Sequence, residues 1–444
     1  GLIGRCAFLM TGVSMYRVPC DKGELTFDLP HGWRGTSVES KSTPPIEDVL
    51  EAVAAAVANP TDSPPLRELA GPGDKVCIVF TDITRASPDH LLVAPVLQEL
   101  ETAGVRDEDI TLLCGIGLHR PSTPEEKVVK LGQQIVDRYR VIDSEPLNAD
   151  ALVDLGTTES GIPLSVNRIA YEADLLIATG IVEPHQYAGY SGGRKTLAVG
   201  AAGEAMIAYT HGPQMADDPG TRLGRIEGNP FHAAITEAAR RAGLRFIVNV
   251  VQDDQKRVVY VRAGEPEAAF QELVAFAKTL YEVPIPQQYD LAVAGVGFPK
   301  DANLYQASRA ASYLFFAPVP VVKPGGFLIV PAPCEEGAGD GVGEQRFLKA
   351  MQDAPDVQFI LEDARQNGYP PGQQRAFVMA KVLEQNSVVI VGAEDPDLIR
   401  SAKFLTAPTM EAAFAMASDK LGGGLDLLVV PHALLTLPIV QTTR

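Results

Sequence analysis

The sequence predicts an α/β protein made of two Rossmann-like domains with largely parallel sheets and a cleft between them. Apolar runs of strand length alternate with helical segments, which is typical of repeated strand–helix units. The runs are continuous in Val, Ile and Leu rather than alternating with polar residues, as in strands buried on both faces of a parallel sheet. At 444 residues the chain is too long for one ordinary core, so two domains are expected.

The expected strands are short, nearly uninterrupted apolar runs at residues 75–81, 109–117, 174–182, 245–251, 290–298, 326–333, 357–363, 387–393 and 425–431. Helices are expected between them, for example over 45–60 and 91–104. A fresh strand follows the Pro- and Gln-rich stretch YEVPIPQQYD (281–290), which therefore predicts a domain boundary.

This boundary gives an N-terminal catalytic and cofactor-binding domain over residues 15–285 and a C-terminal α/β domain over 286–444. The last strand of the chain could pair with the first domain instead of the second. Residues 1–14 precede Met15 without a clear pattern, and we interpret them as a leader, an upstream read-through or a cloning remnant.

Charge and cysteine content restrict the possible partners and compartment. The formal net charge of −18 disfavours nucleic acid and anionic membranes, because both bind basic surfaces. The five cysteines include no CxxC pair, which favours a reducing cytoplasm over a disulfide framework. No apolar stretch reaches the ~20 residues that span a bilayer.

Polar loops follow several expected strands, at residues 82–89, 115–126, 183–200 and 299–310. In open α/β sheets, ligands bind beyond the carboxyl ends of the strands, so these loops are expected to build one pocket. Zinc-protease and dinucleotide motifs are absent: the sequence has no HExxH and no GxGxxG after a strand.

These loops and the segment after them carry the candidate catalytic groups. His119 stands just before a helix start at residues 123–126, and His185 follows a strand end. In SGGRK (191–195), small residues and two cations could bind an anion. Lys195 borders an apolar run, which would lower the pKa of its amine. His211, placed at a turn, could bind a metal. The alternative is that these are surface-turn histidines and a flexible basic loop, and spacing alone does not decide.

Four segments together resemble the nickel-pincer-nucleotide-dependent lactate racemase family: HQYAGYSGGRK (185–195), GIGLHRPST (115–123), THG (210–212) and PKDANLYQ (299–306). The resemblance covers roughly residues 20–440. It implies a 2-hydroxy acid racemase or epimerase whose cofactor is a nickel-bearing pyridinium-3,5-bisthiocarboxylic acid mononucleotide. In such an enzyme, hydride passes reversibly from the substrate's carbinol carbon to the cofactor ring.

The resemblance also implies a role for each matching residue. Lys195 would hold the cofactor covalently and His211 would ligate nickel, while His119 and His185 would act as paired acid–base groups. Further cofactor contacts would come from Asp82, Ile83, Thr84, Arg85, Ser191, Gly192 and Gly193. Gln306, Arg309 and Arg85 would bind substrate. Arg309 stands where the family has lysine, and its planar fork makes a substrate other than lactate plausible, such as a larger hydroxy acid or a sugar acid.

The expected partners are the 2-hydroxy acid substrate, the enzymes that make the cofactor, and a second copy of the chain in a homodimer. Two alternatives remain open from the residues. One is a cofactor- or phosphometabolite-binding carrier without turnover, and the other is a metal-dependent oxidoreductase or lyase that uses the same histidines.

Overall fold

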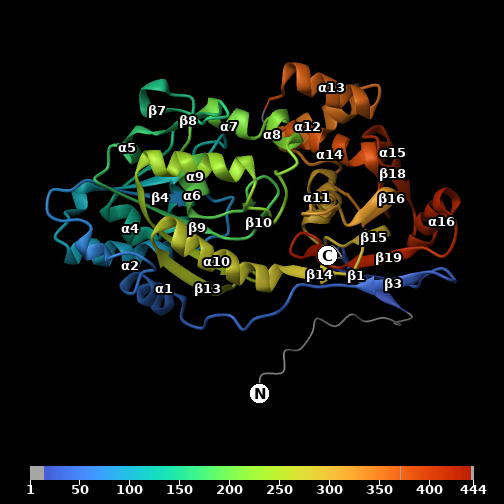
Figure 1. The fold of residues 1–444 in the computed structure, drawn as a ribbon, viewed down its shortest axis with the longest axis horizontal. Helices are drawn as coiled ribbons and strands as arrows, with labels where there is room; N and C mark the ends of the chain where they lie inside the picture. The colour runs from blue at the N-terminus through green and yellow to red at the C-terminus, as the bar shows by residue number, and fades with distance from the viewer. Residues whose placement is uncertain (1–14, 371, 442–444) are drawn as a thin grey trace.

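The computed structural model describes residues 15–370 and 372–441, in which two sheets of six strands organise the chain (Figure 1). Residues 1–14, interpreted above as a leader, an upstream read-through or a cloning remnant, lie outside the described residues. Both sheets are mainly parallel, as expected. None of the helices in the described ranges combines the length and the apolar character needed to cross a membrane.

The first sheet has the strand order β13-β12-β9-β4-β5-β6. Its strands are β4 (Val76–Thr81), β5 (Ile110–Gly115), β6 (Arg140–Asp143), β9 (Leu175–Ile181), β12 (Leu244–Gln252) and β13 (Val258–Gly264). All pairings are parallel except β13 with β12. The strand order reverses between β4 and β9, so a ligand crevice is expected at their carboxyl ends.

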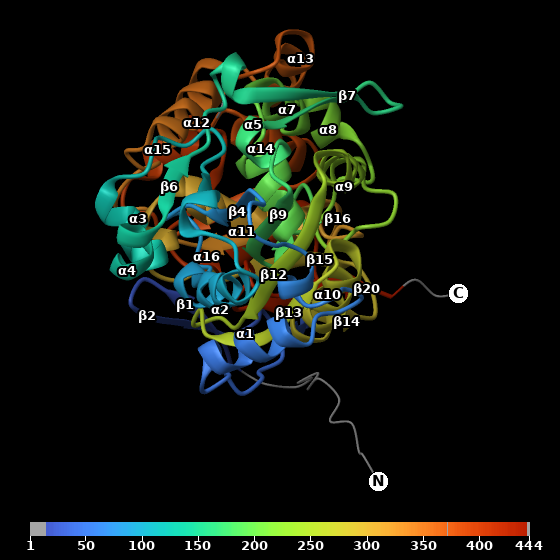
Figure 2. The same cartoon turned by 90° about the vertical axis from the view of Figure 1, so that its left-hand side faces the viewer.

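Helices cover both faces of this sheet (Figure 2). One face packs against α1 (Val49–Ala58) and α2 (Asp89–Thr102). The other packs against α5 (Arg168–Tyr171), α9 (Pro230–Ala242) and α10 (Pro266–Tyr281). Burial on both faces explains why β4 and β9 read as unbroken apolar runs.

The second sheet has the order β18-β17-β16-β15-β19-β3, and all its pairings are parallel. Its strands are β3 (Arg34–Ser37), β15 (Tyr289–Ala294), β16 (Val322–Pro331), β17 (Ser387–Val391), β18 (Leu405–Ala407) and β19 (Asp426–Val430). The surrounding helices are α11 (Leu304–Phe315), α12 (Val342–Asp353), α13 (Val357–Asn367), α14 (Gln374–Gln385), α15 (Pro396–Ser401) and α16 (Met410–Leu421).

One expected strand is wrong. Residues 357–363 belong to the helix α13, which begins after the N-cap Asp356 and buries Ile360, Leu361 and Ala364 on one face. These buried positions recur at helical spacing, so the apolar content of VQFILED reflects an amphipathic helix and not a strand.

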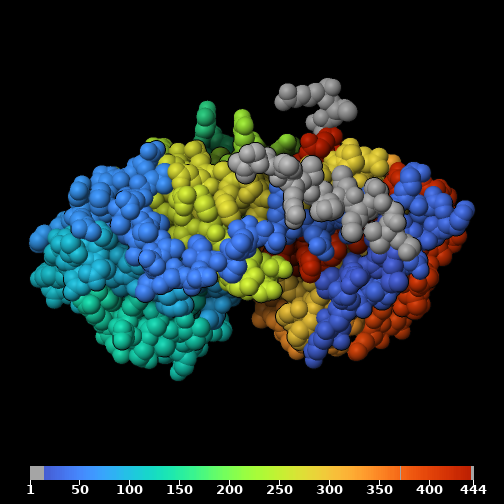
Figure 3. Space-filling view, turned by 90° about the horizontal axis from the view of Figure 1, so that it is seen from below, coloured from blue at the N-terminus to red at the C-terminus, as the bar shows by residue number. Residues whose placement is uncertain are grey.

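The domain boundaries also differ at the N-terminus. Residues 15–37 were assigned to the first domain, but β3 pairs with β19 at the edge of the second sheet. The hairpin of β1 (Tyr16–Cys20) and β2 (Gly23–Phe27) packs there too, because its apolar side chains join the core on the outer face of that sheet. Figure 3 shows this segment in dark blue on the lobe that carries the orange and red residues, and the chain continues in lighter blue onto the other lobe towards α1. At the junction, β14 (Glu282–Ile285) pairs with β20 (Leu437–Val440), the last strand.

Candidate active site

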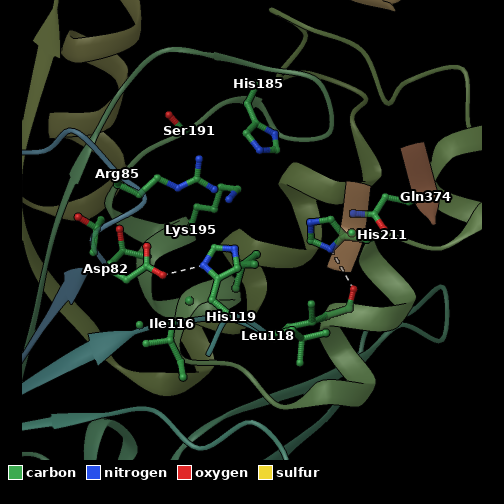
Figure 4. A pocket seen from close by; sticks show the side chains of 18 of the residues that line it. Asp82, Arg85, Ile116, Leu118, His119, His185, Ser191, Lys195, His211 and Gln374 are labelled. Atoms are coloured by element: carbon green, nitrogen blue, oxygen red, sulfur yellow. Dashed lines mark hydrogen bonds and ion pairs between the residues drawn. The ribbon is translucent and has the colours of Figure 1, made fainter. Parts of the chain in front are cut away.

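A cavity of about 520 Å³ lies beyond the carboxyl ends of β4, β5 and β9. Ligand sites in proteins commonly have volumes of ~300–1,000 Å³. Among the residues expected to act on cofactor or substrate, eight line it: Asp82, Arg85, His119, His185, Ser191, Gly192, Lys195 and His211. Figure 4 shows the three imidazoles arranged around the Lys195 side chain. Strand-end loops that are far apart in the sequence therefore meet at one place.

The SGGRK turn places Lys195 in the cavity. Gly192 has a φ of +154°, and a Cβ there would lie 2.6 Å from the Phe270 ring, so only glycine fits. The short helix α6 (Gly193–Lys195) follows, and Arg194 points away from Lys195's cavity to stack on Phe270, 4.4 Å from the ring centroid. Lys195 therefore lies in the cavity, whereas its neighbour Arg194 packs outside it.

Lys195 is half-buried and lines the cavity. Burial, with a further contribution from Arg85, lowers the pKa of Lys195 from 10.5 to about 7. A substantial fraction of the amine is therefore neutral near pH 7, and a neutral amine is nucleophilic.

His119 is held by a carboxylate. Its Nδ1 lies 2.6 Å from Asp82 Oδ2, so the ring donates Nδ1–H and keeps the Nε2 lone pair free. Burial raises the pKa of Asp82, but hydrogen bonds from His119 and Thr84 outweigh it and hold that pKa below its ordinary value. An ionised Asp82 orients His119 as a proton acceptor.

His185 has the opposite arrangement. Its Nδ1 accepts the backbone N–H groups of Tyr187 and Ala188, each at 3.1 Å. The neutral ring therefore carries its proton on Nε2 and acts as a donor. Burial, and then the charges of Lys195 and Arg85, lower the pKa of His185 well below its ordinary value.

His211 ends the helix α7 (Glu204–Thr210), and its Nδ1–H donates to the Ile207 carbonyl at 2.9 Å. Burial and the charge of Lys195 lower the pKa of His211 to about 4. The ring is therefore neutral at ordinary pH with an unprotonated Nε2, the form in which imidazole binds metals.

Several expected site residues do not line the cavity. Ile83, Thr84 and Gly193 lie next to residues that do, and Thr84 donates to Asp82. Gln306 and Arg309 lie on α11, where Arg309 Nη1 donates a hydrogen bond to Gln306 Oε1 at 2.9 Å. Of that segment, Tyr305 reaches the cavity wall.

The cavity wall also contains residues that were not expected from the sequence. Glu183 lies inside a segment singled out by its histidine and Gly-rich turn, so it could have been found there. Other wall residues come from α12 and the connection between α13 and α14, where no sequence motif points to a site: Arg346, Tyr369 and Gln374.

Comparison with known proteins identifies the family of the chain. Residues 20–224 match the lactate racemase N-terminal domain, and residues 286–437 match the lactate racemase C-terminal domain. The chain is 34% identical over 389 residues to the lactate racemase of Lactiplantibacillus plantarum, covering 86% of this chain and 89% of that protein.

This chain belongs to the lactate racemase family.

A second member, the lactate racemase of Thermoanaerobacterium thermosaccharolyticum, is 29% identical over 417 residues, with 93% of this chain and 96% of that protein covered. The solved structure of that racemase apoprotein superposes with a TM-score of 0.83 at 28% identity, over 96% of this chain and all of that one. A Thermotoga maritima protein shares the fold, with a TM-score of 0.60 and 21% identity over 89% of this chain and 98% of that one. The family resemblance and the α/β fold expected from the sequence are confirmed.

Proposed function

We propose that this protein is a 2-hydroxy acid racemase or epimerase that works with a lysine-tethered nickel-pincer nucleotide. The observation that carries the proposal is the convergence of His119, His185, Lys195 and His211 on one cavity. A pocket with the Arg85 guanidinium, a neutral amine and neutral imidazoles suits an anionic substrate and a soft metal cofactor.

The side chains present fit this cofactor. Lys195 offers a buried amine able to form a covalent link, and His211 offers one unprotonated nitrogen. Among residues 15–370 and 372–441, no three His, Cys, Asp or Glu side chains converge as a metal site. A nickel ion here would therefore draw its other donors from a bound group, as the pincer's sulfur and carbon atoms would supply. When bound, the group provides a pyridinium ring that accepts and returns hydride.

The chain's own residues would handle the proton and the substrate's orientation. His119, held by Asp82, takes the hydroxyl proton at Nε2. His185 presents Nε2–H, from which it donates a hydrogen bond to the substrate oxygen. Arg85 brings a positive charge to the cavity wall, which favours a carboxylate. Glycines at 115, 117, 192 and 200 let backbone come close to the bound group.

The test uses protein co-produced with the cofactor-making enzymes, which we propose as its loading partners. Intact mass should show an adduct of several hundred daltons that Lys195→Ala abolishes. His211→Ala should lose nickel, whereas His119→Ala and His185→Ala should keep nickel and lose turnover. Turnover is followed as loss of optical rotation from chiral 2-hydroxy acids.

Each alternative outcome has a distinct meaning. Full racemisation by Lys195→Ala would refute the tether, and equal nickel in all three histidine variants would contradict the role of His211. Adduct and nickel without any change in optical rotation would indicate a carrier protein instead.

A further inference from the structure

One amide side chain lies inside the apolar strand β12, next to the turn that carries Lys195. Asn249 is 0% exposed, and the residues on either side of it along the strand are apolar (RFIVNVV, 245–251). Its Oδ1 accepts the backbone N–H of Gly193 at 2.6 Å. This contact fixes the orientation of the amide, because the reverse orientation would bring two N–H groups together.

Asn249 leaves a polar group of its own unsatisfied. Its Nδ2 is buried and has no hydrogen-bond partner among residues 15–370 and 372–441. A buried donor without an acceptor destabilises a protein, so an apolar side chain would suit the strand itself better. What Asn249 supplies to the fold is therefore its hydrogen bond to Gly193.

This hydrogen bond replaces a cap that the short helix α6 cannot make for itself. The residue before α6 is Gly192, which has no side chain that could accept the first N–H groups of the helix. Gly192 has to be glycine because of its positive φ and its contact with Phe270. Asn249 therefore caps α6 from another element of the fold.

A second hydrogen bond fixes the chain just after Lys195. Thr196 begins a π-helical turn (Thr196–Gly200), and its Oγ1 donates to the Thr179 carbonyl of β9 at 2.7 Å. Between the two anchors, the Lys195 N–H donates to the Gly192 carbonyl at 2.8 Å and closes the turn. Two neighbouring strands of the first sheet, β12 and β9, thus hold the backbone on both sides of the amine.

We propose that Asn249 is a positioning residue for the Lys195 amine: by capping α6 from β12, it keeps that amine inside the cavity. The inference rests on the proposed function, in which Lys195 carries the cofactor. Without the acceptor, the Gly193 N–H would be buried and unsatisfied, and the turn would move until water reached it. Such a movement would expose the Lys195 amine to water as well.

The pH dependence of Lys195 carbamylation by cyanate tests this role in cofactor-free protein, with the modified lysine identified by peptide mass. Cyanate reacts with the neutral amine, so the midpoint of the rate profile reports the pKa of Lys195, which is about 7 in wild type. Asn249→Ala should raise this midpoint by at least about one pH unit, because water stabilises the protonated amine. Asn249→Val, whose branched side chain suits a strand, should do the same.

Val250→Ala is the matched control. Val250 is the next residue of β12 and is 0% exposed, but it packs on the other face of the sheet, in the core with α1 and α2. Its truncation should lower the melting temperature without moving the midpoint. The titratable groups around the amine are the same in all of these variants: Arg85, Glu183, Asp82, His185 and His211.

Protein co-produced with the cofactor-making enzymes separates this inference from the function itself. The yield of the Lys195 adduct should fall about fivefold in both Asn249 variants, since a one-unit rise in pKa leaves about a fifth of the neutral amine at pH 7, and should stay unchanged in Val250→Ala. A midpoint that stays near pH 7 in both Asn249 variants, or that moves as far in Val250→Ala, would overturn the positioning role and leave the racemase function standing. A wild type without any adduct, but with midpoints that move as expected, would reject the function and keep the positioning role.

Discussion

At the scale of single residues, the three cavity histidines differ in what their Nδ1 atoms contact. His119 donates to a carboxylate, His211 donates to a helix carbonyl, and His185 accepts from two backbone amides. Each contact sets where the ring proton lies, and so which nitrogen faces the ligand. Under the proposed function, His119 would therefore act as acceptor, His185 as donor and His211 as metal ligand.

Asp82→Asn tests the orientation of His119. An amide no longer carries the charge that stabilises a protonated His119, and it also permits the wrong tautomer. We expect kcat for the preferred 2-hydroxy acid to fall roughly 10²- to 10⁴-fold, while nickel content and the Lys195 adduct persist. Steady-state kinetics with metal analysis checks this. A variant within threefold of wild type would show that the carboxylate does not support catalysis.

Lys195→Met tests the burial of the amine in cofactor-free protein. Burial lowers the pKa of Lys195 to about 7, so the unfolded chain binds more protons than the folded one between pH 7 and 10.5. The free energy of unfolding of wild type therefore rises with pH across that window. Methionine, which has no charge to bury, is expected to stabilise the protein by roughly 3–5 kcal/mol at pH 6, with a gain that shrinks towards pH 10.

Urea unfolding at pH 6, 8 and 10 measures this difference. A gain that does not change with pH would mean that the amine is solvated in the folded protein.

At the scale of elements, the loop after β4 is held in place by the side chain of Lys130. Lys130 at the end of α3 (Pro124–Leu131) pairs with the fully buried Asp89 and donates to Thr81 Oγ1 at 2.9 Å and to the Ser87 carbonyl at 2.8 Å. It also donates to the Arg85 carbonyl at 3.0 Å. The loop bearing Asp82 and Arg85 is thus anchored by a helix from the next strand–helix unit.

Lys130→Met should remove this anchor. It leaves the Asp89 carboxylate buried without a cation, so we expect a loss of roughly 3–5 kcal/mol in the free energy of unfolding. Lys349→Met is the matched control, because Lys349 pairs with Asp353 on an exposed helix face and should change stability little. Denaturant unfolding compares the two variants, and equal effects would contradict the anchoring role.

At the scale of the whole molecule, the N-terminal segment belongs to the second sheet before the chain crosses to the first. Trp33, the only tryptophan of the sequence, packs against Phe414 of α16 with ring centroids 5.2 Å apart. The outer face of the second sheet is covered by this segment together with α16. The second domain is therefore completed by residues that precede the first.

Trp33→Ala should weaken the second domain in particular. Removing a large ring from a core of this kind costs roughly 3–5 kcal/mol. Tyr171→Ala, at a ring 44% exposed in the first domain, should cost far less. Thermal unfolding followed by circular dichroism measures both. A Trp33→Ala protein as stable as the Tyr171→Ala protein would show that the segment is not needed by the second sheet.

The sequence by itself determined the α/β class, most of the strands, and the residue types of the site. Continuous Val, Ile and Leu runs require burial on both faces, and strand-end loops of a parallel sheet converge because their carboxyl ends share one edge. His119, His185 and Lys195 could be found for that reason.

Only the tertiary structure decided what depends on contacts between distant segments. Residues 357–363 form part of a helix, because burial along one face, and not apolar content alone, determines whether a segment is a helix or a strand. Residues 15–37 belong with the second sheet, because β3 pairs with β19, a strand from the other end of the chain. The tertiary structure also set which nitrogen of each cavity histidine is free, because partners far away in the chain determine hydrogen bonding.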